Sequence, residues 1–275
     1  MYQDLGWYSQ AANLLEIALE KNIKIFGKDH TSLSNNQSNL AMVYQNLGRY
    51  DDAIELLEDA LRKNEIFFGK EHPNTAMTQS NLGWTYQSIG KYERAADLLE
   101  LALASDLKHF DKDHPTIAIC QSNLGTVYKS LGQYKKALKL LKSALKNANV
   151  NLGIDHPTVA IYQSNLALVY QHLEKYDTAI ELLETALKSD IRNLGIEHPH
   201  VAIRQISLAN VYFLINRQEE AMALWKAAYN NSLKNLGEEH EQTIVLRECV
   251  ETEKYRDIWQ KPDFVEKFKK ALNSQ

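Results

Sequence analysis

The sequence predicts an all-α array of tandem helix pairs, and two observations lead to this prediction. A block Gln-Ser-Asn-Leu returns every 42 positions, beginning at Gln37, Gln79, Gln121 and Gln163. Within each period, apolar and small residues recur three or four positions apart, with no strand-like alternation. An array of this kind grows by stacking and needs no single central core. We therefore interpret the 275 residues as one elongated domain.

The repeats are copies of one unit. Residues 37–61 and 163–187 share 19 identical residues out of 25. A period near 42 residues also occurs in other helical repeats and in the blades of β-propellers, so the period alone is ambiguous. The helical spacing inside the period decides in favour of helix pairs.

Each repeat contains two helices joined by a short turn. In one repeat, the first helix begins at His72-Pro73, because proline suits a first helical position that needs no N–H donor. This helix ends near Gly90. The second runs from about Tyr92 to Phe110. The sequence predicts helix pairs near 37–61, 79–110, 121–152, 163–194 and 205–236.

The two ends of the chain contain partial repeats. We expect residues 1–29 to form mainly the second helix of a repeat, residues 30–240 to form five tandem units, and residues 241–275 to form a partial repeat and a capping helix. The capping helix is predicted at 263–272, after Pro262. Because residue 2 aligns with the middle of a repeat, we also expect further domains or repeats upstream of Met1 in a parent protein.

The internal pattern resembles a known family. The run Asn-Leu-Gly-x-x-Tyr-x-x-x-Gly-x-Tyr-x-x-Ala-x-x-Leu-x-x-x-Ala-Leu, from Asn81 to Leu103, resembles a tetratricopeptide repeat, and it recurs from Asn39, Asn123 and Asn165. The ordinary motif has about 34 residues, so each unit carries eight more. The lengthened unit, with its Gly-x-Asp/Glu-His-Pro turn, is similar to the repeats of kinesin light chains and of bacterial proteins with such repeats. The resemblance implies a right-handed tetratricopeptide superhelix, or α-solenoid, and suggests a bacterial member or fragment.

The eight additional residues extend the second helix and add a turn that begins with glycine in every unit but one. We expect these glycines to stop the helix in the left-handed conformation, with Asp111 as a tolerated exception. A second turn, between paired helices, has Gly48 or its equivalent in most repeats. Glu174 and Asn216 replace glycine there, which predicts strained positions if that turn is left-handed.

The recurring histidines allow two interpretations. They form a column of potential metal ligands, each preceded by Asp or Glu: His30, His72, His114, His156, His198 and His240. Neighbouring helices pack about 8–10 Å apart, whereas two zinc ligands each lie about 2 Å from the metal, so the column should not converge on one ion. We favour a structural role in the turn and expect no metal or other cofactor.

Composition narrows the classes of function. The net charge of −4, from 31 basic and 35 acidic residues, gives no footprint for nucleic acid. The sequence has no membrane span and no signal peptide, and the distant Cys120 and Cys249 argue against a disulfide, so we expect a cytoplasmic protein. No nucleophile and base pair or phosphate-binding loop is present, so no catalytic residue is assigned.

The resemblance places the first helices along a binding groove. The predicted groove residues are Asn39, Asn81, Asn123, Asn165, Met42, Met77, Trp84, Ile119, Ile161 and Leu168. Amides can donate to and accept from an extended peptide while apolar neighbours hold its side chains, which predicts a scaffold for a protein or peptide ligand. Alternatively, the asparagines only space the repeats. A different function also stays open, namely a sensor region of a larger bacterial signalling protein, such as a nucleotide-driven switch.

Overall fold

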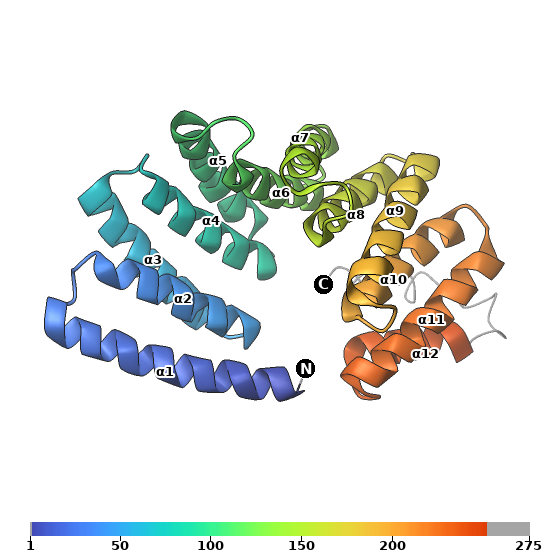
Figure 1. The fold of residues 1–275 in the computed structure, drawn as a ribbon, viewed down its shortest axis with the longest axis horizontal. Helices are drawn as coiled ribbons and strands as arrows, with labels where there is room; N and C mark the ends of the chain where they lie inside the picture. Colours follow the sequence, from blue (N-terminus) through green and yellow to red (C-terminus); the bar gives the residue numbers. More distant parts are fainter. Residues whose placement is uncertain (1, 252–275) are drawn as a thin grey trace. The chain divides into compact units, whose positions relative to one another are not determined.

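The computed structural model describes residues 2–251, and the predicted capping helix at 263–272 lies outside them. All regular structure in the described part is helical (Figure 1). The helices are α1 (Tyr2–Phe26), α2 (Ser32–Asn46), α3 (Tyr50–Phe68), α4 (Pro73–Ser88), α5 (Tyr92–His109), α6 (Pro115–Ser130), α7 (Tyr134–Leu152), α8 (Pro157–His172), α9 (Tyr176–Leu194), α10 (Pro199–Leu214), α11 (Gln218–Leu236) and α12 (Glu241–Glu251). The predicted all-α array of consecutive helix pairs is confirmed.

The chain forms two compact units, residues 1–151 and residues 152–275. In the first unit each helix from α1 to α5 packs against the next one along the chain, and the first helices α2, α4 and α6 also touch one another in sequence. In the second unit α8 to α12 pack consecutively, and α8 touches α10. First helices of neighbouring repeats therefore lie side by side within each unit.

The predicted starts of four helix pairs are about six residues too late. The ranges 79–110, 121–152, 163–194 and 205–236 begin at the recurring block, which lies in the middle of the first helix. The helices themselves begin at Pro73, Pro115, Pro157 and Pro199, as the proline signal indicates. The second helices α7, α9 and α11 end as predicted at Leu152, Leu194 and Leu236, whereas α5 ends at His109, one residue before Phe110. The remaining predicted range, 37–61, is too short at both ends, because α2 begins at Ser32 and α3 ends at Phe68.

Small residues allow paired helices to approach closely. A Cβ placed on Gly83 of α4 would lie 2.8 Å from Cγ of Leu99 in α5, so no larger side chain fits there without movement. Ala95 and Ala102 of α5 are completely buried at the same contact.

The turn between paired helices is left-handed in five repeats. Gly48, Gly90 and Gly132 have φ between 70° and 76°, while Glu174 and Asn216 have φ of 56° and 62°. Glu174 and Asn216 therefore keep the backbone conformation of the glycines that they replace. This left-handed conformation costs conformational free energy in any residue that has a Cβ atom. The predicted strain at Glu174 and Asn216 is confirmed in its geometry.

The other turn, after each second helix, differs from the prediction. Gly69, Gly195 and Gly237 have φ of 84–89° but ψ of 154–174°, which lies outside the left-handed helical region. This extended conformation with positive φ is essentially restricted to glycine, so aspartate cannot substitute for it. Accordingly Asp111 is not among the residues with positive φ in the described chain, and α5 ends early because its turn has another shape.

Neighbouring repeats are joined by a tyrosine and a glutamate 28 residues apart. The hydroxyl groups of Tyr44, Tyr86 and Tyr212 donate to Glu16, Glu58 and Glu184 at 2.6–2.7 Å, and Tyr128 donates to Glu100. Burial and the nearby carboxylate raise the pKa of Tyr44, Tyr128 and Tyr212 to about 12. Each bond links the first helix of one repeat to the second helix of the preceding one.

Candidate functional site

The predicted asparagine positions all lie on first helices. Asn39, Asn81 and Asn123 belong to the first unit, where Asn39 is exposed and the other two are half-buried. Among the described residues, no hydrogen bond involves the side chains of these three asparagines. Asn165 of the second unit is half-buried and does have a partner within the protein. In the first unit the amides are therefore available to a ligand.

Exposed apolar side chains accompany these asparagines. In the first unit their exposed fractions are 52% for Met42, 46% for Met77, 41% for Trp84 and 51% for Ile119. Four large apolar groups on helices α2, α4 and α6 thus remain open to solvent. In the second unit Ile161 is 37% exposed and Leu168 is half-buried, so the surface there is less open.

Side chains other than the asparagines bridge adjacent first helices in the first unit. Gln45 of α2 donates to Thr85 of α4 at 2.5 Å, and Gln87 of α4 donates to Thr126 of α6 at 3.0 Å. The sequence interpretation missed these glutamines. Their recurrence 42 residues apart was the available signal. These bonds supply the spacing contact that the alternative hypothesis assigned to the asparagines.

The recurring histidines cap helices. In each of the six, Nδ1 accepts a hydrogen bond of 3.1–3.3 Å from the backbone N–H two residues later. The rings of His30, His72 and His114 also stack on Phe26, Phe68 and Phe110. Each imidazole therefore uses its Nδ1 atom in a hydrogen bond at the N-terminus of its own helix. No group of three potential ligands in the described part of the chain could hold a metal ion.

In three repeats the acidic residue before the histidine forms an ion pair with the second helix of its own repeat. Lys108 pairs with Glu71, Arg192 with Asp155 and Lys234 with Glu197, at 2.5–2.9 Å. Backbone carbonyls of the same turns accept bonds from Ser105, Asn147, Ser189 and Asn231. These contacts fasten the lengthened turn to the longer second helix.

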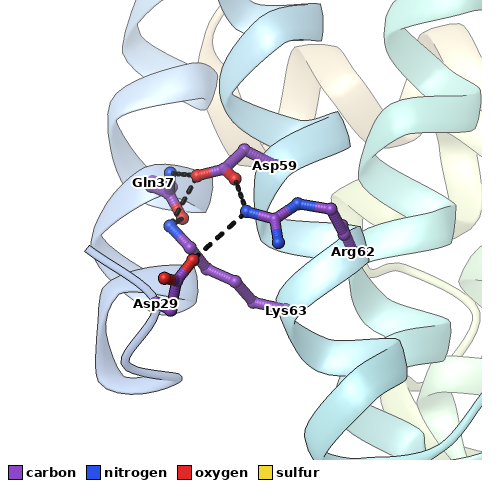
Figure 2. Close-up of polar contacts among 5 residues, drawn as sticks. All are labelled: Asp29, Gln37, Asp59, Arg62 and Lys63. Carbon is purple, nitrogen blue, oxygen red and sulfur yellow. Dashed lines mark hydrogen bonds and ion pairs between the residues drawn. The ribbon is translucent and has the colours of Figure 1, made fainter. Parts of the chain in front are cut away.

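The first complete repeat uses a different cluster for the same purpose (Figure 2). Asp59 accepts hydrogen bonds from Gln37, Lys63 and Arg62 at 2.5–2.7 Å, and Arg62 also reaches Asp29 at 3.5 Å. Burial alone would raise the pKa of Asp59, but these hydrogen bonds lower it to about 2. Lys63 is 5% exposed, so Asp59 and Gln37 compensate a buried ammonium group. We interpret the cluster as structural, because the side chains of Gln37, Arg62 and Lys63 all donate to acceptors within it.

Both cysteines are buried free thiols. Burial raises the pKa of Cys120 to about 12 and moves that of Cys249 in the same direction. A thiol with a raised pKa and no access to solvent is a poor nucleophile.

In the part of the chain that the structure describes, every helix is too short or too polar to cross a lipid bilayer.

Comparison with protein families gives a consistent result. One family model described as tetratricopeptide repeat matches residues 1–66, 32–108 and 158–234, and a second model of the same description matches residues 117–158. Together these matches cover well over half of the chain. A comparison with curated proteins found no match.

Solved structures with the same fold include repeats of the lengthened type. One such structure contains nearly identical TPR-like repeats of a kinesin light chain from Podosopora anserina. It is 30% identical in sequence to this chain, with a TM-score of 0.63, and the match covers 76% of this chain and 99% of that one. BtubC (BKLC) from P. vanneervenii is 22% identical with a TM-score of 0.64, covering 86% and 92%. At that identity the second similarity concerns the fold alone.

Proposed function

Because the chain belongs to the tetratricopeptide-repeat family, with repeats of the kinesin-light-chain type, we propose that it is a scaffold that binds an extended protein segment along its first helices. Tetratricopeptide domains are typically scaffolds without enzymatic activity, and we propose the same for this chain. The binding face is defined by Asn39, Asn81 and Asn123 with Met42, Met77, Trp84 and Ile119. The sensor hypothesis concerns domains outside this chain and stays a prediction.

The observation that supports this proposal best is the combination of exposed apolar groups with unbonded amides in the first unit. Trp84 is 41% exposed on α4, although tryptophan is usually well buried. The side-chain amide of Asn81, three residues earlier on the same helix, makes no hydrogen bond among the described residues. A ligand backbone can bond to the amides while its apolar side chains contact Trp84 and Met77.

The energetic contributions should be unequal. Aromatic groups near the centre of an interface often contribute most of the binding energy, so Trp84 is the expected hot spot. Each asparagine would add a hydrogen bond of about 0.5–1.5 kcal/mol. Asn165 already has a partner, and we therefore assign it a smaller role than the three asparagines of the first unit.

A display library of random peptides, panned on the immobilised chain, tests the proposal. We expect enriched peptides with apolar residues whose binding is lost in Trp84→Ala. The matched control is Leu101→Ala, which removes an apolar side chain that is 58% exposed on the second helix α5. Equal retention of the enriched peptides by the wild type and by Trp84→Ala would contradict the assignment.

A further inference from the structure

Three of the second helices share a charge pattern that α7 reverses. Three positions on one face of α3, α5 and α9 hold acidic residues. These are Asp51, Glu55 and Glu58 in α3, Glu93, Asp97 and Glu100 in α5, and Asp177, Glu181 and Glu184 in α9. The equivalent positions in α7 are Lys135, Lys139 and Lys142, and Lys146 follows on the same face. We refer to these four residues as the lysine stripe.

The lysine stripe is exposed and regular. All four lysines are exposed, and their spacing of four, three and four residues places them on one side of the helix. With a rise of 1.5 Å per residue, the stripe is about 16 Å long. Lys142 also has a partner within the protein, so the inference rests on Lys135, Lys139 and Lys146. Among the described residues these three have no ion pair.

The stripe is unfavourable for the helix that carries it. Helix α7 contains five lysines and no acidic residue, so its neighbouring charges repel one another. Lys135 and Lys136 also lie in its first turn, where the helix dipole favours anions, whereas α3, α5, α9 and α11 have acidic residues there. A local arrangement that opposes stability, at positions where α3, α5 and α9 all hold acidic residues, indicates a role outside folding.

We propose that the lysine stripe binds an acidic helical segment of a protein partner. A partner helix with carboxylates spaced by four and seven residues matches the spacing of Lys135, Lys139 and Lys146. A nucleic acid or an anionic membrane would extend beyond one helix. It would then meet the acidic faces of α3 and α5 in the same unit, on a protein with a net charge of −4. This surface lies on a second helix and does not depend on the proposed role of the first helices.

The test uses two synthetic helical peptides and the full chain. Both peptides are alanine-based, and one has glutamate at the three matching positions where its twin has glutamine. We expect fluorescence anisotropy to detect the glutamate peptide and not the glutamine peptide. Raising the salt concentration from about 50 mM to about 500 mM should weaken binding about tenfold or more, because exposed charges are screened.

Two charge-matched double variants locate the surface. Lys135→Glu with Lys139→Glu should weaken binding at least about tenfold and should fold, because α3 has acidic residues at the same positions. Lys70→Glu with Lys112→Glu changes the net charge equally at exposed turn positions and should leave binding nearly unchanged. Circular dichroism confirms that each variant folds. Should the reversed variant unfold, Lys135→Gln with Lys139→Gln replaces it.

Several outcomes would overturn the proposal. The two peptides could bind equally, or the two double variants could weaken binding equally. The stripe could also bind a single-stranded RNA or an anionic vesicle more tightly than the glutamate peptide. Finally, sedimentation could reveal a dimer of the chain that the reversed variant abolishes, which would make the partner a second copy.

Discussion

The hydroxyl of Tyr86 donates a hydrogen bond of 2.6 Å to Glu58, which lies 28 residues earlier in the preceding repeat. Tyr86 is 4% exposed, whereas Glu58 is exposed, so the bond joins a buried ring to the surface of the next helix. The same pair recurs at three other junctions between repeats. The array is therefore held together by a repeated polar contact as well as by apolar packing.

Removing this hydroxyl should weaken the contact between α3 and α4. Tyr86→Phe is expected to lower the free energy of unfolding by about 1 kcal/mol, since the lost bond has a charged acceptor at a partly exposed site. Urea unfolding measures the change. Tyr50→Phe is the control, because Tyr50 has no such hydrogen bond among the described residues, and equal losses in both variants would refute the role of the contact.

Replacing Glu174 with glycine should stabilise the protein. Glu174 has φ of 56°, a conformation that costs an L-residue about 1 kcal/mol and glycine almost nothing. We expect Glu174→Gly to raise the free energy of unfolding by about that amount. The control Glu181→Gly, inside α9, should instead destabilise by about 1 kcal/mol. An unchanged or lower melting temperature for Glu174→Gly would show that the turn is not strained.

Substitution of Asp59 should lower the free energy of unfolding, because the buried Lys63 needs a carboxylate partner. In Asp59→Asn the buried ammonium group loses its carboxylate, and we expect a loss of about 1–3 kcal/mol, less than for a fully buried pair. The wild type should lose this contribution as pH falls from about 4 to about 2, because the folded pKa lies below the unfolded value. Acid titrations of both proteins, followed by circular dichroism, should therefore differ in that range, and identical titrations would contradict the account.

Asp106 should produce the opposite dependence on pH. Burial raises its pKa to about 6, although His114 and His109 act against this shift. The unfolded chain releases this proton near pH 4 and the folded chain near pH 6, so stability should fall as pH rises between these values. Asp106→Asn should remove that slope and stabilise the protein at neutral pH. An amide is tolerated at this position, since Asn64 is its equivalent and bonds to Thr78 at 3.0 Å.

This prediction is checked by urea unfolding at several pH values between 4 and 7. A slope that persists in Asp106→Asn would assign the effect to other groups. The buried Asp190 provides a useful comparison, because it occupies the same position in another repeat and has Arg204 at 3.1 Å. Asp190→Asn should destabilise rather than stabilise.

The sequence allowed the helices to be predicted because each local signal has one dominant physical cause. Proline after His72 marked a helix start, and Gly48 and its equivalents marked a left-handed turn that the structure confirms even at Glu174. The conformation after each second helix could not be predicted, because Gly69 signals positive φ but does not determine ψ.

The contacts between repeats were harder to predict from the sequence than the helices themselves. The pairing of Tyr86 with Glu58 follows from how neighbouring helices face each other, which a repeat pattern alone does not give. The cluster around Lys63 was also missed, since equivalent positions hold Ser105 or Asn147 and the buried lysine belongs to one repeat only. The exposure of Met42, Met77 and Trp84 fits the predicted face, whereas ligand binding there stays a proposal.

The most direct test of the proposed binding face is the affinity of Asn81→Ala with Asn123→Ala for a peptide selected on the wild-type chain. Two lost hydrogen bonds of about 0.5–1.5 kcal/mol each should weaken binding about five- to a hundredfold, while the melting temperature stays nearly unchanged, because Gln45 and Gln87 bridge the first helices. Asn13→Ala, an exposed asparagine on α1, serves as the control. A double variant that melts many degrees lower and, while still folded, binds the peptide with wild-type affinity would contradict the account.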